Sequence, residues 1–247
     1  MVARQIAHQY WGQQLAPATG RDAWMVSALS DAYASFYVRS AFGNLAYSDR
    51  MQGLREAVED PTEYRATEGQ LNRERRPLSL TGSTRFSDIS GKLRSDYGAY
   101  VMADMIRLRI GDYAYFYALD RLARRIGSVP DSRVSTDDLQ AAFEETSGQD
   151  LSDFFDYWVH GGFIPEIELW LSHVEGEEPG VQGCIETNIP FGRMDVPVEL
   201  IDQEGERTVA ALVDIIDGRG SFWVPDRTED VEVELDPLGL SMAYSRT

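Results

Sequence analysis

The spacing of apolar residues changes once along this chain, near residue 162. Up to that point apolar positions recur every three or four residues, which is the period of one face of an α-helix. After Gly161 and Gly162 they alternate with polar residues, as they do in a strand with one buried face. The change in period divides the chain into a helical part, residues 1–162, and a strand-rich part, residues 163–247.

The helical part predicts several helices separated by Gly and Pro. In the first, Val2, Ile6 and Tyr10 form an apolar face, and Gly12 and the loop with Pro17 and Gly20 end the helix. The second carries many aromatic residues and few charges, which is typical of a buried helix. Ser135, followed by acidic residues, is an N-cap signal for a later helix. The predicted helices cover residues 2–14, 23–43, 49–66 and 113–126 and a helix that opens at 135, and the polar stretch 67–92 is predicted to be a surface loop.

The strand-rich part predicts a β-sandwich. Ile167 and Leu169 alternate with Glu166 and Glu168, and the apolar stripe continues to Leu171. Similar stretches, separated by turn residues, follow at 196–200, 209–213, 222–224 and 231–235. Short, evenly spaced strands of this kind are typical of a sandwich of about seven strands. The predicted fold class is therefore α+β, with an all-α subdomain followed by a small antiparallel β-sandwich.

The charge of the chain is strongly acidic and unevenly placed. Of its formal net charge of −18, most arises from Phe163 onward, where 19 acidic residues face 5 basic ones. A surface this negative disfavours binding to nucleic acid or anionic lipid, so we expect no nucleic-acid partner. No run of eighteen apolar residues occurs, so we expect no membrane span and a soluble chain. The compartment stays open, because any targeting segment would precede Met1.

Cysteine and histidine usage excludes most metal sites in the strand-rich part. Cys184 is the only cysteine, so neither an intrachain disulfide nor a cysteine metal cluster can form. Cys184 and His173 have no metal-ligand spacing, and we expect both to be ordinary core or surface residues.

The first predicted helix has the frame of a zinc helix. A helix of the H-E-x-x-H kind places two His residues at i and i+4 on one face, with a Glu that acts as general base. In this chain the three positions hold Arg4, Gln5 and His8. The helix, Val-Ala-Arg-Gln-Ile-Ala-His-Gln-Tyr-Trp-Gly, and the following Asp22 and Trp24 resemble the M1 family of zinc aminopeptidases, the gluzincins. In that family the two segments read V-A-H-E-x-A-H-Q-W-x-G and D-x-W-x-N-E-G.

Two later stretches resemble the same family. Residues 95–112 are similar to its Y-x-K-G-A-x-V-x-x-M-L-R-x-x-x-G-D pattern, and 147–158 to its S-G-x-D-L-x-x-F-F-x-x-W pattern. The resemblance implies that the catalytic tyrosine of the family aligns with Ser95, with Tyr97 two residues further on. The second stretch is structural, because its apolar residues fall at helical spacing and predict a packing face: Leu151, Phe154, Phe155 and Trp158.

The chemistry of the family is missing at four positions. The resemblance places the third zinc ligand nineteen residues after His8, at Ser27. A serine hydroxyl is a poor zinc ligand, and the guanidinium of Arg4 stays protonated and has no lone pair to offer. Gln5 cannot deprotonate a metal-bound water. With Ser95 in place of the tyrosine, we expect no catalytic residue and no bound metal, and His8 is a remnant.

Three functions are compatible with this pattern. The first is a degenerate M1-like protein, a pseudopeptidase module that serves as a scaffold or interaction unit. The second is an active zinc aminopeptidase with a rearranged site, and only in that case is zinc expected as a cofactor. The third is a peptide-binding module in which Arg4, with Tyr97 nearby, contacts a ligand carboxylate. Against the third, Arg4 can instead pair internally with Asp22 or Asp31.

The resemblance also bears on partners. The N-terminal β-domain of the family and its substrate-anchoring G-x-M-E-N strand have no counterpart in the printed sequence. We therefore expect an association, either with a polypeptide that supplies this N-terminal half or with a second copy of the chain. An apolar helix face left without a neighbour would favour such an association.

Overall fold

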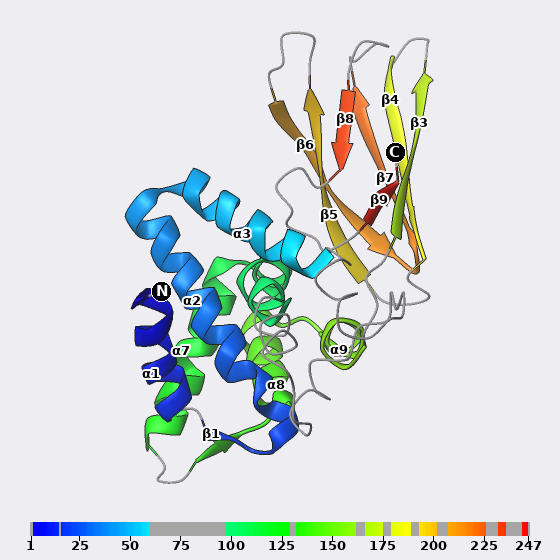
Figure 1. Ribbon diagram of the computed structural model, residues 1–247. Coiled ribbons are helices and arrows are strands. Elements are labelled where there is room, and N and C mark those ends of the chain that lie inside the picture. Colours follow the sequence, from blue (N-terminus) through cyan, green and yellow to red (C-terminus); the bar gives the residue numbers. More distant parts are fainter. Residues whose placement is uncertain are drawn as a thin grey trace, which may run out of the picture. The chain divides into compact units, whose positions relative to one another are not determined.

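The computed structural model describes residues 2–14, 16–59, 97–128, 132–161, 166–174, 179–188, 193–201, 207–225, 232–235 and 244–246 (Figure 1). The chain separates into two compact units, Met1–Phe163 and Ile164–Thr247. The first is helical and the second is built from strands, so the fold is of the α+β class. The predicted loop at 67–92 and Ser95 lie outside the described residues.

The helical unit follows the predicted order of helices with shifted boundaries. Its helices are α1 (Val2–Gln14), α2 (Trp24–Phe42), α3 (Asn44–Glu59), α6 (Ile106–Ile110), α7 (Asp112–Ser128), α8 (Thr136–Ser147) and α9 (Ser152–Phe155). A 3-10 helix, η1 (Gly20–Asp22), precedes α2, and two π-helices, η3 (Val101–Met105) and η4 (Asp156–His160), precede α6 and follow α9. The predicted bounds of the first helix, residues 2–14, agree with α1. The prediction for α3 began five residues too late.

Helix ends follow the local chemistry of the sequence. Gly43 ends α2 with a φ of +90°, a conformation that a residue with a Cβ rarely adopts. Ser135 caps α8 as predicted, and Asp138 completes a capping box with it. Figure 1 shows α1 lying along α2, with α3 turning back from the end of α2.

The core of the helical unit is rich in aromatic residues. The predicted packing face of residues 151–158 is confirmed, since all four of its apolar side chains are buried. Gly98 lies against α2, where a Cβ would approach the Cβ of Ala28 to 2.9 Å, so glycine permits this close helix contact. The largest fully buried side chains include Trp11, Trp24, Trp158, Tyr100, Tyr115, Phe143 and Phe155.

Some apolar positions that predicted buried faces are exposed. On α1, Val2, Ile6 and Tyr10 are 68%, 63% and 43% exposed. On α2, Tyr37 and Phe42 are also exposed, so the predicted burial of this helix holds only for its first part, Trp24 to Ser35, where nine residues are buried. Period alone shows that a helix has an apolar face, but it does not show whether another element covers that face.

The carboxylate of Asp22 joins two distant parts of the helical unit. Its Oδ2 accepts hydrogen bonds from the backbone N–H of Thr19 at 3.0 Å and from its hydroxyl at 2.6 Å. Its Oδ1 accepts from the backbone N–H of Thr136 at 2.8 Å and from its hydroxyl at 2.9 Å. Trp24 Nε1 donates to the same Thr136 hydroxyl at 3.1 Å. The start of α2 is thereby fixed to the start of α8.

Burial and hydrogen bonding act on Asp22 in opposite directions. Burial alone would raise the pKa of this carboxyl, but the hydrogen bonds from Thr19 and Thr136 outweigh burial and hold the pKa below its ordinary value. A short parallel pair, β1 (Ala16–Pro17) with β2 (Arg133–Val134), also joins the segment before α2 to the segment before α8.

The second unit contains seven described strands in one sheet, in the order β8-β5-β6-β7-β4-β3-β9. The pairs are antiparallel except β3 with β9, which is parallel. The strands are β3 (Glu166–Val174), β4 (Gly180–Thr187), β5 (Arg193–Ile201), β6 (Arg207–Ile216), β7 (Arg219–Pro225), β8 (Glu232–Leu235) and β9 (Tyr244–Arg246). Their number agrees with the prediction.

The sheet curls between β6 and β7. These strands meet at a two-residue turn, in which Asp217 and Gly218 have φ values of 50° and 84°, as in a type I′ hairpin. Among the described residues, β6 and β7 pair only at Ile216 and Arg219, the two residues that flank this turn. A Cβ at Gly220 would lie 2.7 Å from Val213 Cγ1, so side chains of β6 lie over β7. The curl gathers buried residues from both parts into one core: Val181, Ile185, Val196, Val198, Val213, Ile215, Phe222 and Val224.

The predicted stripe on β3 is only partly correct. Ile167 is buried and Leu169 is half-buried, whereas Leu171 is 42% exposed.

None of the helices that the structure describes has both the length and the apolar content that crossing a bilayer requires.

Replacing Asp22 by Asn should destabilise the chain by about 1–3 kcal/mol, because charge-assisted hydrogen bonds to buried donors are weakened. The measurement is the free energy of unfolding from urea titration. Asp49→Asn, at an exposed position of α3, is the matched control and should change the free energy by less than about 0.5 kcal/mol. Equal effects of the two substitutions would contradict a structural role for Asp22.

The stabilisation by Asp22 should also depend on pH. The folded-state pKa lies below the unfolded value of about 3.9, so the contribution is complete above that value and is lost as pH falls through the folded-state pKa. The stability difference between wild type and Asp22→Asn should therefore be constant from about pH 7 to about pH 5 and shrink below about pH 4. Urea titrations across this range measure it, and a difference that grows with acid would show the sign to be wrong.

Candidate functional site

Arg4, at the first zinc-ligand position of the predicted motif, forms an ion pair with Asp31 of α2. Its Nε donates to Asp31 Oδ2 at 2.8 Å and lies 2.7 Å from Oδ1. The side chain of Asp31 is 7% exposed and that of Arg4 is 44% exposed. Arg50 of α3 approaches the same carboxylate at 3.7 Å and donates from Nε to Ser35 Oγ at 2.8 Å. A buried carboxylate is thus held between guanidinium groups from two helices.

The pairing of Arg4 resolves an alternative raised by the sequence. Of the two acids considered as internal partners, the structure pairs Arg4 with Asp31, whereas Asp22 binds the threonines described above. Asp31 lies one turn after Ser27 on α2. The charge of Arg4 is therefore directed toward the helix that carries the third-ligand position.

His8, at the second ligand position, is exposed and lies against its own helix. A Cβ at Gly12 would come within 2.9 Å of the imidazole Cε1 and Nδ1 and within 3.3 Å of Val26 Cγ1. Because Gly12 has no side chain, the His8 ring has room at this place beside α2.

The remaining predicted positions are divided between the α1–α2 contact and the core. Ser27 is half-buried on α2, and Gln5 is exposed on α1. Tyr97 is only 6% exposed, and its hydroxyl donates to the backbone carbonyl of Trp158 at 2.8 Å. The structure therefore brings Arg4, His8 and Ser27 to one pair of helices and directs the Tyr97 hydroxyl toward η4.

The side chains at these positions do not fit a zinc ion. A zinc site needs at least three protein ligands with available lone pairs. Arg4 has none to offer, and the carboxylate of Asp31 is engaged by two arginines. Throughout the described part of the chain, no three His, Cys, Asp or Glu side chains are grouped so that they could hold a metal.

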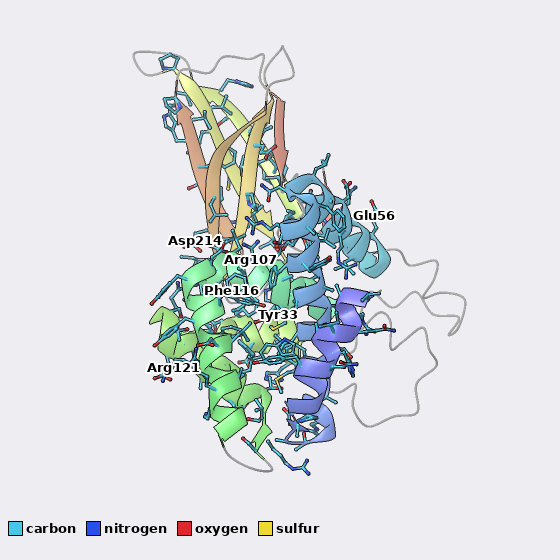
Figure 2. All side chains as sticks on the ribbon, turned by 90° about the vertical axis from the view of Figure 1, so that its left-hand side faces the viewer. Tyr33, Glu56, Arg107, Phe116, Arg121 and Asp214 are labelled. Carbon is cyan, nitrogen blue, oxygen red and sulfur yellow. The ribbon has the colours of Figure 1, made fainter. Side chains whose placement is uncertain are left out.

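The aromatic residues next to this contact provide no general base. Trp11 of α1 packs edge-on against Tyr33 of α2, with ring centroids 5.3 Å apart. Burial raises the pKa of Tyr33 to about 12, and Tyr10 and Asp120 add to the effect, so its hydroxyl stays protonated at neutral pH. Figure 2 shows Tyr33 in the helical unit below Phe116 and Arg107, between α7 and α2.

A surface groove lies elsewhere, between α7 and α8, with a volume of about 290 Å³. Ion pairs cross it, from Arg121 to Glu145 at 2.8 Å and from Arg125 to Asp138 at 2.9 Å. The sequence does not reveal these pairs, because the partners of the arginines lie on another helix. Within each pair the arginine and the carboxylate neutralise each other, so we interpret the groove as a packing feature of the two helices.

Comparison with known proteins supports the fold. No protein-family model matches the sequence, and no curated protein matches it. The crystal structure of an aminopeptidase A from Legionella pneumophila, in complex with aspartic acid, is similar to this chain with a TM-score of 0.73. The fold of the chain is peptidase-like.

The extent of this likeness limits what it shows. It covers 100% of this chain but 26% of the aminopeptidase, so the chain spans about a quarter of the length of that protein. The aligned residues are 16% identical, a level at which the likeness shows the fold alone. The chain therefore has the fold of part of a larger protein, an aminopeptidase.

Replacing Arg4 by Ala should lower the free energy of unfolding by about 1–2 kcal/mol, because the buried carboxylate of Asp31 would lose its closest partner. The loss stays moderate since Arg50 remains nearby. Arg124→Ala is the control, because Arg124 forms a 2.8 Å pair with Asp120 but its side chain is 79% exposed. That substitution should lower the free energy of unfolding far less than Arg4→Ala does, because solvent screens an exposed pair. If chemical denaturation gave equal losses, the Arg4 pair would have no structural importance.

Proposed function

We propose that this chain is a catalytically degenerate M1 aminopeptidase-like protein that acts as a scaffold or interaction unit. The observation that carries the proposal is the ion pair between Arg4 and Asp31, in which a cation occupies the first ligand position and neutralises a neighbouring carboxylate. A zinc ion at this place would meet a positive charge and would lack its ligands.

The proposal includes a finer description of the fold. The helical unit corresponds to the thermolysin-like part of an M1 catalytic domain, and the curled sheet corresponds to the β-sandwich that follows it. The aminopeptidase-like fold supports this view, as do the buried packing residues of the 151–158 segment. The hydrogen bonds of Asp22 and Trp24 to Thr136 give the D-x-W pattern a structural reason that is independent of catalysis.

The surface of the helical unit supports an interaction role. Val2, Ile6 and Tyr10 form an exposed apolar face on α1, and Tyr113 and Tyr117 are exposed on α7. Apolar faces of this kind are typical of surfaces that contact another protein. A partner polypeptide or a second copy of the chain remains the proposed occupant, and the acidity of the sheet unit disfavours nucleic acid.

The peptide-binding alternative receives less support. It relied on Arg4 as the residue that recognises a carboxylate, and the structure gives Arg4 an internal carboxylate instead. Tyr97, the second residue considered for ligand contact, uses its hydroxyl within the core. The active-enzyme alternative is decided by the experiment below.

Wild-type protein should contain no stoichiometric zinc after purification and should not hydrolyse aminoacyl reporter substrates above the uncatalysed rate. Elemental analysis and a fluorogenic aminopeptidase assay measure the two properties on the same sample. Stoichiometric zinc together with turnover that a chelator abolishes would show that the chain is an active metallopeptidase, and the proposal would fail.

Restoring the family residues should create a metal site. The triple variant Arg4→His, Gln5→Glu, Ser27→Glu supplies two imidazoles one turn apart and a facing carboxylate, so we expect it to bind about one zinc ion per chain. Isothermal titration with zinc measures the binding. The control variant Arg4→Ala, Gln5→Glu, Ser27→Ala breaks the ion pair without supplying the ligands and should not bind. If neither variant binds zinc, α1 and α2 do not have the geometry of the M1 site.

A further inference from the structure

One face of the sheet unit carries two exposed tryptophans. β3, β4 and β7 lie side by side in the sheet (Figure 1). Side chains alternate between the two faces of a strand, and the buried Val181, Ile185 and Phe222 direct one face of these strands to the core. Trp170 of β3 and Trp223 of β7 belong to the opposite face, where they are 60% and 42% exposed.

The strand register fixes the separation of the two tryptophans. Trp170 pairs with Cys184 of β4, and Cys184 pairs with Ser221 of β7, two residues before Trp223. Two steps between strands of about 4.8 Å each and two residues of about 3.4 Å along a strand place the two tryptophan Cα atoms roughly 12 Å apart. Exposed Gln182 and Ser221 lie on the same face. The face therefore offers two separate indole rings with neutral polar side chains beside them.

The ring of Trp223 is supported by a glycine of the neighbouring strand. A Cβ at Gly180 would lie 2.5 Å from Trp223 Cζ2 and 2.8 Å from Cη2, so the indole lies over Gly180 where a side chain would displace it. Although the ring rests on β4, a large part of it stays open to solvent. A ring that is already held in position loses little conformational freedom when a ligand stacks on it.

The charge of the sheet unit restricts what can bind to this face. From Phe163 onward the 19 acidic and 5 basic residues give a net charge of −14. On the face itself Glu186 pairs with Arg219 at 3.2 Å, so the attraction for a cation arises from the unit as a whole. A polyanion is repelled, and so is a second copy of the same acidic unit, whereas a cationic partner is attracted.

We propose that the outer face of β3, β4 and β7 binds an arginine-rich segment of a partner protein, with one guanidinium over Trp170 and a second over Trp223. Tryptophan is the aromatic side chain that attracts cations most strongly, and a guanidinium stacks flat on an aromatic face. An extended segment rises about 3.3 Å per residue, so side chains four positions apart lie on one side of it at about 13 Å, close to the separation of the tryptophans. The charge of the unit and the exposed rings select the same ligand.

This inference goes beyond the proposed function, because it does not depend on the zinc positions of the helical unit. Zinc content and peptidase turnover decide the proposed function, whereas peptide binding by the sheet unit of the same chain decides the inference. Either one can fail while the other holds.

A labelled peptide of alternating Arg and Gly tests whether the chain binds this chemistry. We expect fluorescence anisotropy to show binding to the wild-type chain, and we expect the affinity to fall as the salt concentration rises from about 0.01 M to about 1 M, because the Debye length shrinks from about 30 Å to about 3 Å. The same peptide with Gln in place of Arg should bind far more weakly. Absence of binding by the Arg peptide, or equal binding of the two peptides, overturns the proposal.

Trp170→Leu separates stacking on the rings from diffuse attraction by the acidic unit. Leucine keeps an apolar side chain but has no aromatic face, so the Arg peptide should bind about twofold to fivefold more weakly. Adding Trp223→Leu should weaken binding by a similar factor again, because sites this far apart act independently. Tyr113→Leu, which removes an aromatic ring that is 81% exposed on α7, is the matched control and should leave the affinity unchanged.

The variants also identify the other possible ligands. If both tryptophan variants bind the Arg peptide as tightly as the wild type, the attraction is diffuse and the proposal fails. It also fails if the wild type binds a neutral glucose oligomer and not the Arg peptide, since the rings then serve a sugar. Trp170 is exposed, so Trp170→Leu should fold as the wild type does, and its affinity decides the matter even if loss of the Trp223 contact with Gly180 destabilises the double variant.

Discussion

The four hydrogen bonds of the Asp22 carboxylate are the constraint on which the helical unit depends. Two of them come from the neighbouring Thr19, and the other two come from Thr136, more than a hundred residues away, so the carboxylate joins the places where α2 and α8 begin. Because α2 packs against α1 and carries both Ser27 and Asp31, fixing its start also fixes the place of the candidate site. The segment that contains Asp22 and Trp24 therefore has a structural function that does not require a metal.

Much of the fold could be predicted because its signals are local. The limits of α2, the cap at Ser135 and the alternation in the strands depend on residues a few positions apart. The exposure of Ile6 and Leu171 could not be predicted, because burial depends on which other element covers a face. The π-helices were missed for a related reason: one inserted residue shifts the helical phase, and no composition signal marks it.

The candidate site was predictable in its positions but not in its contacts. Spacing along the chain identified Arg4 and Ser27, because a motif fixes separations within and between two helices. The partner of Arg4 remained open between two acids, since the choice depends on how α1 and α2 cross. The hydrogen bond between Tyr47 of α3 and the buried Asp104 of η3 was not foreseen, because the mutual approach of these elements is determined only by tertiary packing.

The parallel pairing of β3 with β9 has a consequence for how the sheet unit assembles. Glu166 and Tyr244 lie opposite each other although they are 78 positions apart in sequence, whereas hairpins such as β6–β7 close over two residues. Closing a long loop costs more chain entropy than closing a short one, so contacts of high sequence separation form late. The antiparallel strands can therefore associate while the outer edge of β3 is still open. During that interval the edge offers unpaired backbone groups to other chains, and docking of the last strand ends the exposure.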